Sequence, residues 1–293
     1  MTTTSPSLYL ERPGPLQSFW GLFRQTCIAT YEDNCFGTAK GAAYSALLAF
    51  FPVLASLAAI FASINAAPVA RVFSRLLFQV IPPGTEELVR SHFTAQGSRP
   101  MGLIVLAVVL STFGASGVMM TLMEGFQAAY RLPSGRPFLK QRAVALLLVF
   151  IAEVPAVGSS ALIVFGAHIE RSMLGWVGLV PGDEIRVSVV LLFGFLRYVA
   201  ALGAIVLVTG LLYYVGPNRP IRLRSVWPGA FLATVLWLLA TMGFALYVRN
   251  FANYNVLYGS IGAVIALLVW MYLLAVIALF GCEYNAVRER LLD

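Results

Sequence analysis

The chain has 293 residues, of which 59% are hydrophobic and only 11% are charged, and its formal net charge is +7. Because soluble domains carry about 25% charged residues, this chain has too few charges to cover a water-facing surface. The composition therefore excludes an ordinary soluble protein and indicates a membrane protein, in which a positive net charge is typical of cytoplasmic flanks and of contact with anionic headgroups.

The N-terminal region precedes the first long apolar run. Residues 1–15 lack the apolar core of a signal peptide, so we expect a short disordered tail there. In residues 16–37, apolar side chains recur at three- and four-residue spacing from Leu16 to Tyr31. This pattern predicts an amphipathic helix that lies on the membrane surface. A similar stripe over residues 68–80 predicts a second interfacial helix, with a core helix of a soluble subdomain as the alternative.

Residues 38–293 are predicted to form one membrane domain. Six apolar runs each reach the roughly 20 residues that a helix needs to cross a bilayer. The predicted spans are 38–64, 101–123, 142–167, 188–214, 226–248 and 261–284. Twelve Lys and Arg residues flank the spans on one side and seven on the other, which favours cytoplasmic N and C termini. The predicted fold class is therefore an all-α membrane protein with six transmembrane helices plus interfacial amphipathic helices.

Three prolines fall within or beside these spans. Pro52 lies in the middle of the first span and Pro155 in the third, where each is predicted to kink its helix and free a carbonyl group. Pro228 is expected in the first turn of the fifth span, where proline is tolerated.

Glu153 and Arg197 are the charges placed most clearly inside spans. Their positions in the third and fourth spans put both near the midplane of a core about 30 Å thick. Because a lone charge at this depth is costly, we expect an ion pair between them. Such a pair would line a polar cavity for a charged substrate or a proton, or would only join the two helices.

A second polar set is predicted at the cytoplasmic boundary. Lys40 begins the first span, Glu124 ends the second and Glu283 ends the sixth, so the two acids and the lysine could form a network. The alternative is that these charges only extend towards water. Tyr44, one turn after Lys40, joins the polar groups predicted to line a cavity.

The stretch NYNVLYGSIGA, residues 253–263, precedes the last apolar run. The predicted topology places it at the outer boundary, where aromatic residues are common and a serine can cap a helix. It is interpreted as a helix start or as an ordered, re-entrant gate beside a cavity. Its residues of interest are Tyr254, Asn255, Tyr258, Gly259 and Ser260.

No enzymatic motif is recognised. The two histidines, His92 and His168, have no metal-ligand spacing, and no nucleophile elbow, phosphate-binding loop or dinucleotide fingerprint occurs. Three cysteines without CxxC spacing indicate neither a zinc site nor a disulfide framework. We therefore predict no catalytic residues, no metal, no cofactor and no nucleic-acid partner.

Several segments resemble the YihY / virulence factor BrkB family. The last two segments together resemble the C-terminal signature of the family, which is the most specific part of the match; the others are the start of the first span, the second span with its exit, and two basic turns. In order they are AKGAAYSALLAFFPVLASL (39–57), FGASGVMMTLMEGFQAAY (113–130), RPFLKQR (136–142), LLYYVGPNR (211–219), WPGAFLATVLW (227–237) and YNVLYGSIGAVIALLVWMYLLAVIALFGCEYNA (254–286).

This resemblance implies a multi-pass protein of the bacterial cytoplasmic (inner) membrane, in a family formerly labelled ribonuclease BN, a label considered mistaken. Some members are linked to serum resistance or to envelope lipid export. The resemblance thus favours a transporter or lipid translocator with membrane lipids, and an anionic lipid-like substrate, as its partners. A non-transporting envelope scaffold is the alternative, and a hydrolase is the third hypothesis.

Overall fold

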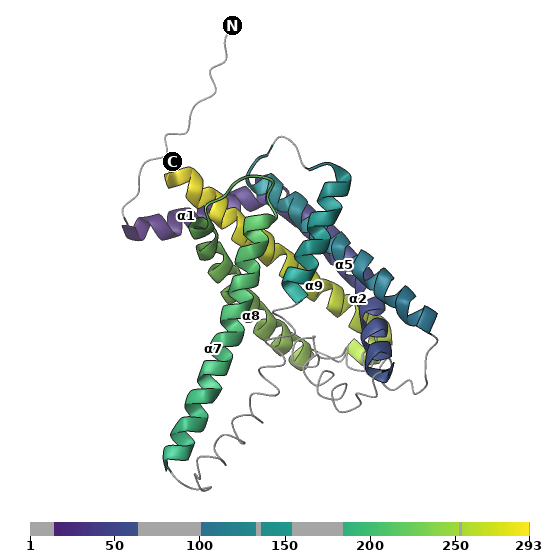
Figure 1. Ribbon diagram of the computed structural model, residues 1–293. Helices are drawn as coiled ribbons and strands as arrows, with labels where there is room; N and C mark the ends of the chain where they lie inside the picture. The colour runs from purple at the N-terminus through teal and green to yellow at the C-terminus, as the bar shows by residue number, and fades with distance from the viewer. Residues whose placement is uncertain (1–14, 64–100, 133–135, 154–183, 252–253, 293) are drawn as a thin grey trace.

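The computed structural model describes residues 15–63, 101–132, 136–153, 184–251 and 254–292, and every regular element in these ranges is an α-helix (Figure 1). In chain order the helices are α1 (Pro15–Glu32), α2 (Cys35–Ser63), α5 (Met101–Ala129), a helix over residues 138–153, α7 (Glu184–Val215), α8 (Leu223–Phe251) and α9 (Tyr254–Leu292). The predicted all-helical class is confirmed for these residues.

Five helices, α2, α5, α7, α8 and α9, are long and apolar enough to cross a membrane. They coincide with five of the six predicted spans. The third predicted span, 142–167, begins within the helix over residues 138–153 and continues outside the described residues. The predicted interfacial helix over residues 68–80 also lies outside them. The described part of the chain is thus a bundle of apolar helices of membrane-spanning length.

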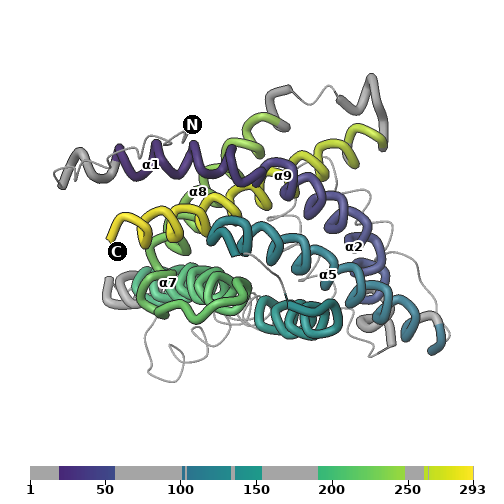
Figure 2. The backbone as a smooth tube through the Cα atoms, turned by 90° about the horizontal axis from the view of Figure 1, so that it is seen from above, coloured from purple at the N-terminus to yellow at the C-terminus, as the bar shows by residue number. Residues whose placement is uncertain are grey.

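Helix α1 lies across one end of this bundle. In Figure 2, α7 is seen end-on whereas α1 lies in the plane of the view, alongside the end of α9. Leu22 of α1 packs with Tyr284 and Val287 of α9. The helix ends at Glu32 and not at the predicted residue 37, because the backbone turns at Asn34, whose φ of 52° lies in the left-handed region. Asparagine adopts that region more readily than most residues.

Close packing between α2 and α5 rests on small residues. The buried face of α2 carries four alanines, at positions 39, 42, 43 and 49. At Gly114 of α5 an added Cβ would lie only 2.8 Å from the Cβ of Ala49, so a side chain there would push the helices apart. Small residues that let helix backbones approach are typical of membrane helix interfaces.

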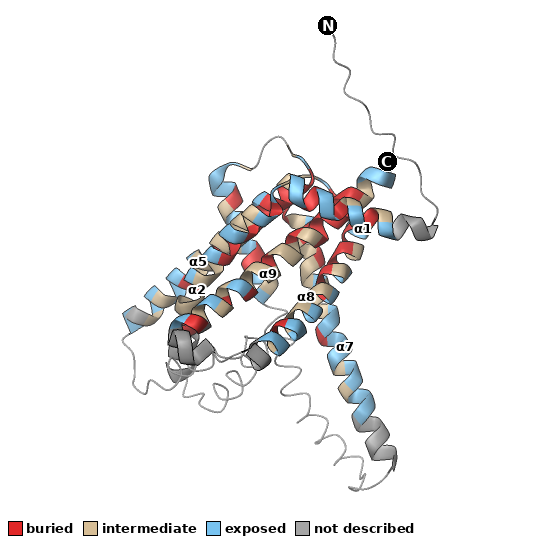
Figure 3. Cartoon of the chain, turned by 180° about the vertical axis from the view of Figure 1, so that it is seen from behind, coloured by how far each residue is buried: buried red, intermediate tan, exposed pale blue. Residues whose placement is uncertain are grey.

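Burial is uneven along the bundle (Figure 3). The main core surrounds Phe126, Tyr213, Val226 and Leu279, close to the end where α1 lies. By contrast, most side chains described between Leu191 and Leu202 in α7 are exposed. In a bilayer such an apolar surface is in contact with lipid tails.

Candidate functional site

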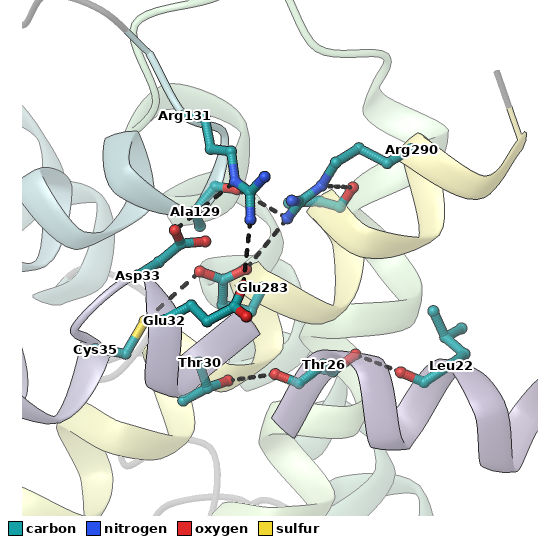
Figure 4. Close-up of polar contacts among 11 residues, drawn as sticks. Leu22, Thr26, Thr30, Glu32, Asp33, Cys35, Ala129, Arg131, Glu283 and Arg290 are labelled. Carbon is teal, nitrogen blue, oxygen red and sulfur yellow. Dashed lines mark hydrogen bonds and ion pairs between the residues drawn. The ribbon is translucent and has the colours of Figure 1, made fainter. Parts of the chain in front are cut away.

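Polar side chains gather at the end of the bundle where α1 ends, α2 begins, α5 ends and the last turns of α9 lie (Figure 4). These groups come from four different parts of the chain and converge on one buried carboxyl group. We name them the polar cluster; its members are Glu32, Asp33, Cys35, Arg131, Glu283 and Arg290.

Glu283 is the innermost member, and its side chain is 0% exposed. Its Oε1 accepts a hydrogen bond from the Cys35 thiol at 3.6 Å, and its Oε2 lies 3.5 Å from Nη2 of Arg290. Charge-assisted hydrogen bonds are normally about 2.7–2.9 Å long, so the Arg290 contact is long, and a thiol is a weak donor. The carboxyl group is therefore buried with two weak partners.

Arg131 joins the ends of α5 and α1. Its φ of 52° places it in the left-handed position that follows many helices and is usually occupied by glycine. The N–H of Arg131 donates to Ala128 O at 2.7 Å, and the N–H of the next residue, Leu132, donates to Gln127 O at 3.1 Å. These two bonds close a Schellman motif.

The side chain of Arg131, at a position where glycine is common, contacts two acidic residues at the end of α1. Its Nε lies 3.7 Å from Asp33 Oδ1 and its Nη2 lies 3.7 Å from Glu32 Oε2. Arg131 thus links the end of α5 to the end of α1 through two ion pairs.

Arg290 divides its donors among three acceptors. Nε donates to Ala286 O within α9 at 3.2 Å, and Nη2 donates to Ala129 O at 3.2 Å while approaching Glu283. Because Ala129 is the last residue of α5, its carbonyl has no partner inside that helix. Arg290 therefore caps α5, and its Nη2 is shared between Ala129 O and Glu283 Oε2.

Three buried oxygen atoms beside these residues have no hydrogen-bond partner within the described chain: Asp33 Oδ2, Tyr130 Oη and Glu289 Oε2. Native proteins pair nearly all such atoms with protein groups or with ordered water. Their proximity to one buried carboxyl group makes this end of the bundle a polar interior with unused hydrogen-bonding capacity.

Tyr130 connects the polar cluster to the neighbouring ion pair of Arg219 and Glu289. The Arg219 guanidinium lies over the Tyr130 ring, with its central carbon 4.8 Å from the ring centroid. Burial raises the pKa of the Tyr130 hydroxyl above its ordinary value, and Cys282 and the carboxylates of Glu289 and Glu283 add to the rise. Tyr130 therefore keeps its proton and can act as a donor.

Asn285 joins α9 to α8 just below the polar cluster. Its Oδ1 accepts the Gly229 N–H at 2.7 Å, and its Nδ2 donates to Val226 O at 2.9 Å. An added Cβ on Gly229 would lie 2.1 Å from Gly281 O, so the two helices touch backbone to backbone here. The junction surrounds Pro228, which lies five residues inside α8 and not in its first turn as predicted.

Two further contacts bring α7 to the same end. The Tyr213 hydroxyl, which is fully buried, donates to Ala278 O of α9 at 2.7 Å. Arg136 donates to the carbonyl groups of Val215, Gly216 and Pro217 at 2.9, 3.0 and 3.3 Å. Burial lowers the pKa of Arg136 from its ordinary value, but arginine remains charged, so this contact caps the negative end of the α7 dipole.

The predicted boundary network is only partly present. Glu283 lies in the polar cluster, but its neighbours are Arg290, Cys35 and Asp33 instead of Lys40 and Glu124. Lys40 and Glu124 are both exposed, and Tyr44 is 61% exposed. Lys40 and Tyr44 are one helical turn apart, so they share one face of α2, and that face is exposed and points away from α9.

Among the described residues, Glu153 and Arg197 form no ion pair with each other. Glu153 is exposed near the end of the helix over residues 138–153, whereas Arg197 is half-buried, 6.0 Å from the ring centroid of Tyr198. The expected pair assumed that helices adjacent in sequence lie side by side. Near its C-terminal end α7 packs against the helix over residues 138–153 through Leu212 and Val215, but its earlier part, which carries Arg197, diverges from that helix (Figure 1).

Of the predicted kink and gate residues, the structure describes Pro52 and the backbone of the gate segment but not Pro155. Pro52 lies inside α2, which continues as one helix to Ser63. Pro155 lies outside the described residues. Helix α9 begins at Tyr254, so the backbone of Tyr254, Asn255, Tyr258, Gly259 and Ser260 is helical. Ser260 is therefore inside the helix and does not cap its start; the described residues do not include these side chains.

Sequence reasoning did not identify Arg131, Arg290, Cys35 or Asn285 as site residues. One signal was available: Arg290 follows Glu283 by seven residues, which places both on one face of a helix. The other contacts join residues far apart in the chain. Within the described ranges, no group of three or more His, Cys, Asp and Glu residues could hold a metal ion.

Comparison with known proteins gives a match to a family described as virulence factor BrkB over residues 29–292. A ribonuclease-like protein, YfkH, of Bacillus subtilis is 30% identical over 214 residues, covering 72% of this chain and 75% of that protein. A UPF0761 membrane protein of Alteromonas mediterranea is 29% identical over 276 residues, covering 92% and 87%. One of Pseudoalteromonas translucida is 24% identical over 282 residues, covering 96% and 87%. No solved structure matches the chain significantly.

Proposed function

The chain belongs to the virulence factor BrkB family of membrane proteins, and on this premise we propose that it is a six-span protein of the bacterial inner membrane that moves an anionic, lipid-like molecule across the bilayer. Three features of the described helices support the proposal: their alternation between two ends, the position of their basic residues, and a cation inside an apolar helix.

The alternation of the helices supports six crossings. The helix over residues 138–153 begins at the end of the bundle that holds the polar cluster, and α7 begins at the opposite end (Figure 1). These opposite starting points support the predicted third span, 142–167, of which residues 142–153 are described as helix. Together with the five long apolar helices, that predicted span would make six crossings.

The basic residues support cytoplasmic termini. Arg131, Arg136, Arg219 and Arg290 all lie at the end of the bundle where α1 and the end of α9 lie. Loops on the cytoplasmic side of membrane proteins carry an excess of Lys and Arg. We therefore assign the polar-cluster end to the cytoplasm.

The observation that carries the transport proposal is Arg197. It lies within Leu191–Val215, the apolar part of α7, and is half-buried. Its sequence neighbours Leu196, Tyr198 and Val199 are 51%, 59% and 47% exposed, so the guanidinium lies beside a surface that faces lipid. Ionisable groups inside a span are expensive and are characteristic of substrate or ion pathways.

The chemistry of the guanidinium indicates the substrate class. A guanidinium presents donors in a planar fork that fits phosphate, and it keeps its charge in apolar surroundings. An amphipathic anion could place its tails against the exposed face of α7 and its phosphate near Arg197. A lipid-like phosphate is therefore the substrate that this arrangement fits best.

Native mass spectrometry of the purified protein tests this directly. We expect wild-type protein to retain anionic phospholipid, and Arg197→Gln to reduce the retained fraction about tenfold, since a hydrogen bond to a charged group contributes about 1.5–3 kcal/mol. Arg222→Gln is the matched control, because Arg222 is exposed and lies outside the apolar segments. Equal lipid retention in wild type and both variants would instead favour a non-transporting scaffold.

A further inference from the structure

We propose that the polar cluster is a proton-binding site, in which one proton is held between the carboxyl groups of Asp33 and Glu283. The inference rests on charge balance, on the placement of the two carboxyl groups and on the unused oxygen atoms beside them. It does not depend on the transport proposal.

The charges in the polar cluster do not balance. Glu32, Asp33 and Glu283 supply three carboxyl groups, whereas Arg131 and Arg290 supply two guanidinium groups. The adjacent Arg219 and Glu289 neutralise each other. With all groups ionised the cluster carries a net charge of −1, and two of its three carboxylates, those of Asp33 and Glu283, are mostly buried while both guanidinium groups are partly exposed. Burying carboxylates that are only weakly paired is unfavourable. One added proton restores neutrality.

The two carboxyl groups are placed to share that proton. Figure 4 shows Asp33 and Glu283 side by side, and Asp33 acts electrostatically on Glu283. Two carboxylates that share a site cannot both ionise easily. The cationic partners of both acids are at 3.5 Å or more, so neither carboxylate has a short charge-assisted bond within the described chain.

The neighbouring titratable and charged groups come from every element packed around Glu283. They contribute two further acids, two thiols, a phenol and three guanidinium groups: Glu32, Glu289, Cys35, Cys282, Tyr130, Arg131, Arg219 and Arg290. Arg219 and Glu289 pair with each other, so the net charge of the polar cluster stays at −1 when all its groups are ionised.

The unused oxygen atoms provide independent support. Tyr130 is only 9% exposed, its hydroxyl has no partner in the described chain, and Glu283 and Glu289 act on that hydroxyl electrostatically. Asp33 Oδ2 is also without a partner there. A hydroxyl donor and a carboxylate oxygen beside a buried acid are the groups that hold a shared proton or the water molecule through which it moves.

The site can exchange its proton with water on one side. The side chains of Glu32 and Arg131 are 59% and 57% exposed, whereas those of Asp33 and Glu283 are 15% and 0% exposed. On binding, one O–H bond forms on a carboxyl oxygen with a proton taken from water; on release that bond breaks and the proton returns to water. Loss of the proton leaves the unbalanced charge beneath α1, so the native state should weaken as the pH rises.

Infrared spectroscopy of the reconstituted full-length protein tests the proposal. A protonated carboxylic acid has a C=O band distinct from that of a carboxylate, and ¹³C-labelled aspartate or glutamate shifts it. The Glu153→Gln background is used throughout, because Glu153 lies outside the polar cluster and its own carboxylic-acid band could overlap the one sought. At neutral pH we expect a carboxylic-acid band that shifts with one of the two labels and disappears reversibly at alkaline pH.

Two variants and one control assign the band. Glu283→Gln and Asp33→Asn each remove one acid, restore charge balance and should abolish the band, whereas Glu124→Gln should retain it because Glu124 is exposed and outside the cluster. If either of the first two variants does not fold, the other still decides. The melting temperature should fall with rising pH in the background protein and change little in Glu283→Gln. A band of unchanged intensity in both cluster variants, or no band at neutral pH, would overturn the proposal.

Discussion

The side-chain oxygen of Asn285 on α9 accepts the backbone N–H of Gly229 on α8 at 2.7 Å, and Asn285 is 1% exposed. Both residues fall in the two segments that together resemble the C-terminal signature of the family. The bond lies beside Pro228, whose missing N–H weakens the helix locally. A side chain of α9 thus hydrogen-bonds to the backbone of α8 next to the proline that interrupts its hydrogen bonding.

Replacing Asn285 with alanine should lower the free energy of unfolding by about 2 kcal/mol, because it removes both of the buried hydrogen bonds that join Asn285 to the Gly229 N–H and the Val226 carbonyl. The measurement is thermal or denaturant unfolding of the purified protein in detergent. Asn218→Ala is the control, since Asn218 is exposed in the α7–α8 connection. Equal stability of the two variants would contradict the role given to Asn285.

The same junction predicts intolerance of a methyl group at Gly229. Gly229→Ala would place a Cβ 2.1 Å from Gly281 O, a backbone atom that cannot rotate away. We expect a loss of about 3 kcal/mol or failure to fold. Gly243→Ala, on the same helix with no atom within 4 Å of the new Cβ, should be neutral or more stable by about 0.5 kcal/mol. Similar behaviour of the two alanine variants would show that α8 and α9 do not approach as described.

The native cysteines report topology without engineered sites. Cys27 on α1 is exposed, whereas Cys35 and Cys282 are buried. A membrane-impermeant maleimide should therefore label one thiol per chain in inside-out vesicles and none in right-side-out vesicles. Cys27→Ser should abolish this labelling, while unfolding in detergent should make the other two thiols reactive. Labelling of Cys27 in right-side-out vesicles would reverse the proposed orientation.

Arg131 offers a test of the left-handed cap of α5. Its two ion pairs are long, at 3.7 Å, and its own side chain is 57% exposed, so they should contribute little, about 0–1 kcal/mol in total. A non-glycine residue at a φ of 52° costs about 1 kcal/mol. Arg131→Gly should therefore be about 1 kcal/mol more stable than Arg131→Ala, because both lack the side chain and only glycine adopts this φ freely. Identical stabilities of these two variants in unfolding experiments would argue against the left-handed cap.

The helices were predictable because apolar runs report membrane-spanning length directly. Their ends were less so: α9 runs from Tyr254 to Leu292, beyond both limits of the predicted span 261–284. Hydropathy ends a span where polar residues begin. In this chain Glu283, Asn285 and Arg290 continue the helix, and their side chains bond to other helices.

The polar contacts were harder to predict because they depend on which helices are neighbours and on which face each residue lies. The expected Glu153–Arg197 pair required the part of α7 that carries Arg197 to lie beside the preceding helix, and the two diverge there (Figure 1). Glu283 was recognised as a boundary charge, but its partner Arg290 lies two turns further along the same helix. Cys35 contributes from a position 248 residues away, a contact that no local pattern indicates.

The most direct test of the proposed transport function is a leaflet-exchange assay in proteoliposomes containing a fluorescent anionic phospholipid. Quenching of the outer leaflet by a membrane-impermeant reductant measures how fast inner-leaflet lipid moves outwards. We predict that wild-type protein accelerates this movement over protein-free vesicles, and that Arg197→Gln slows it about tenfold while Arg222→Gln does not. Wild-type protein that folds and inserts, but leaves the exchange rate equal to that of empty vesicles, would contradict lipid translocation.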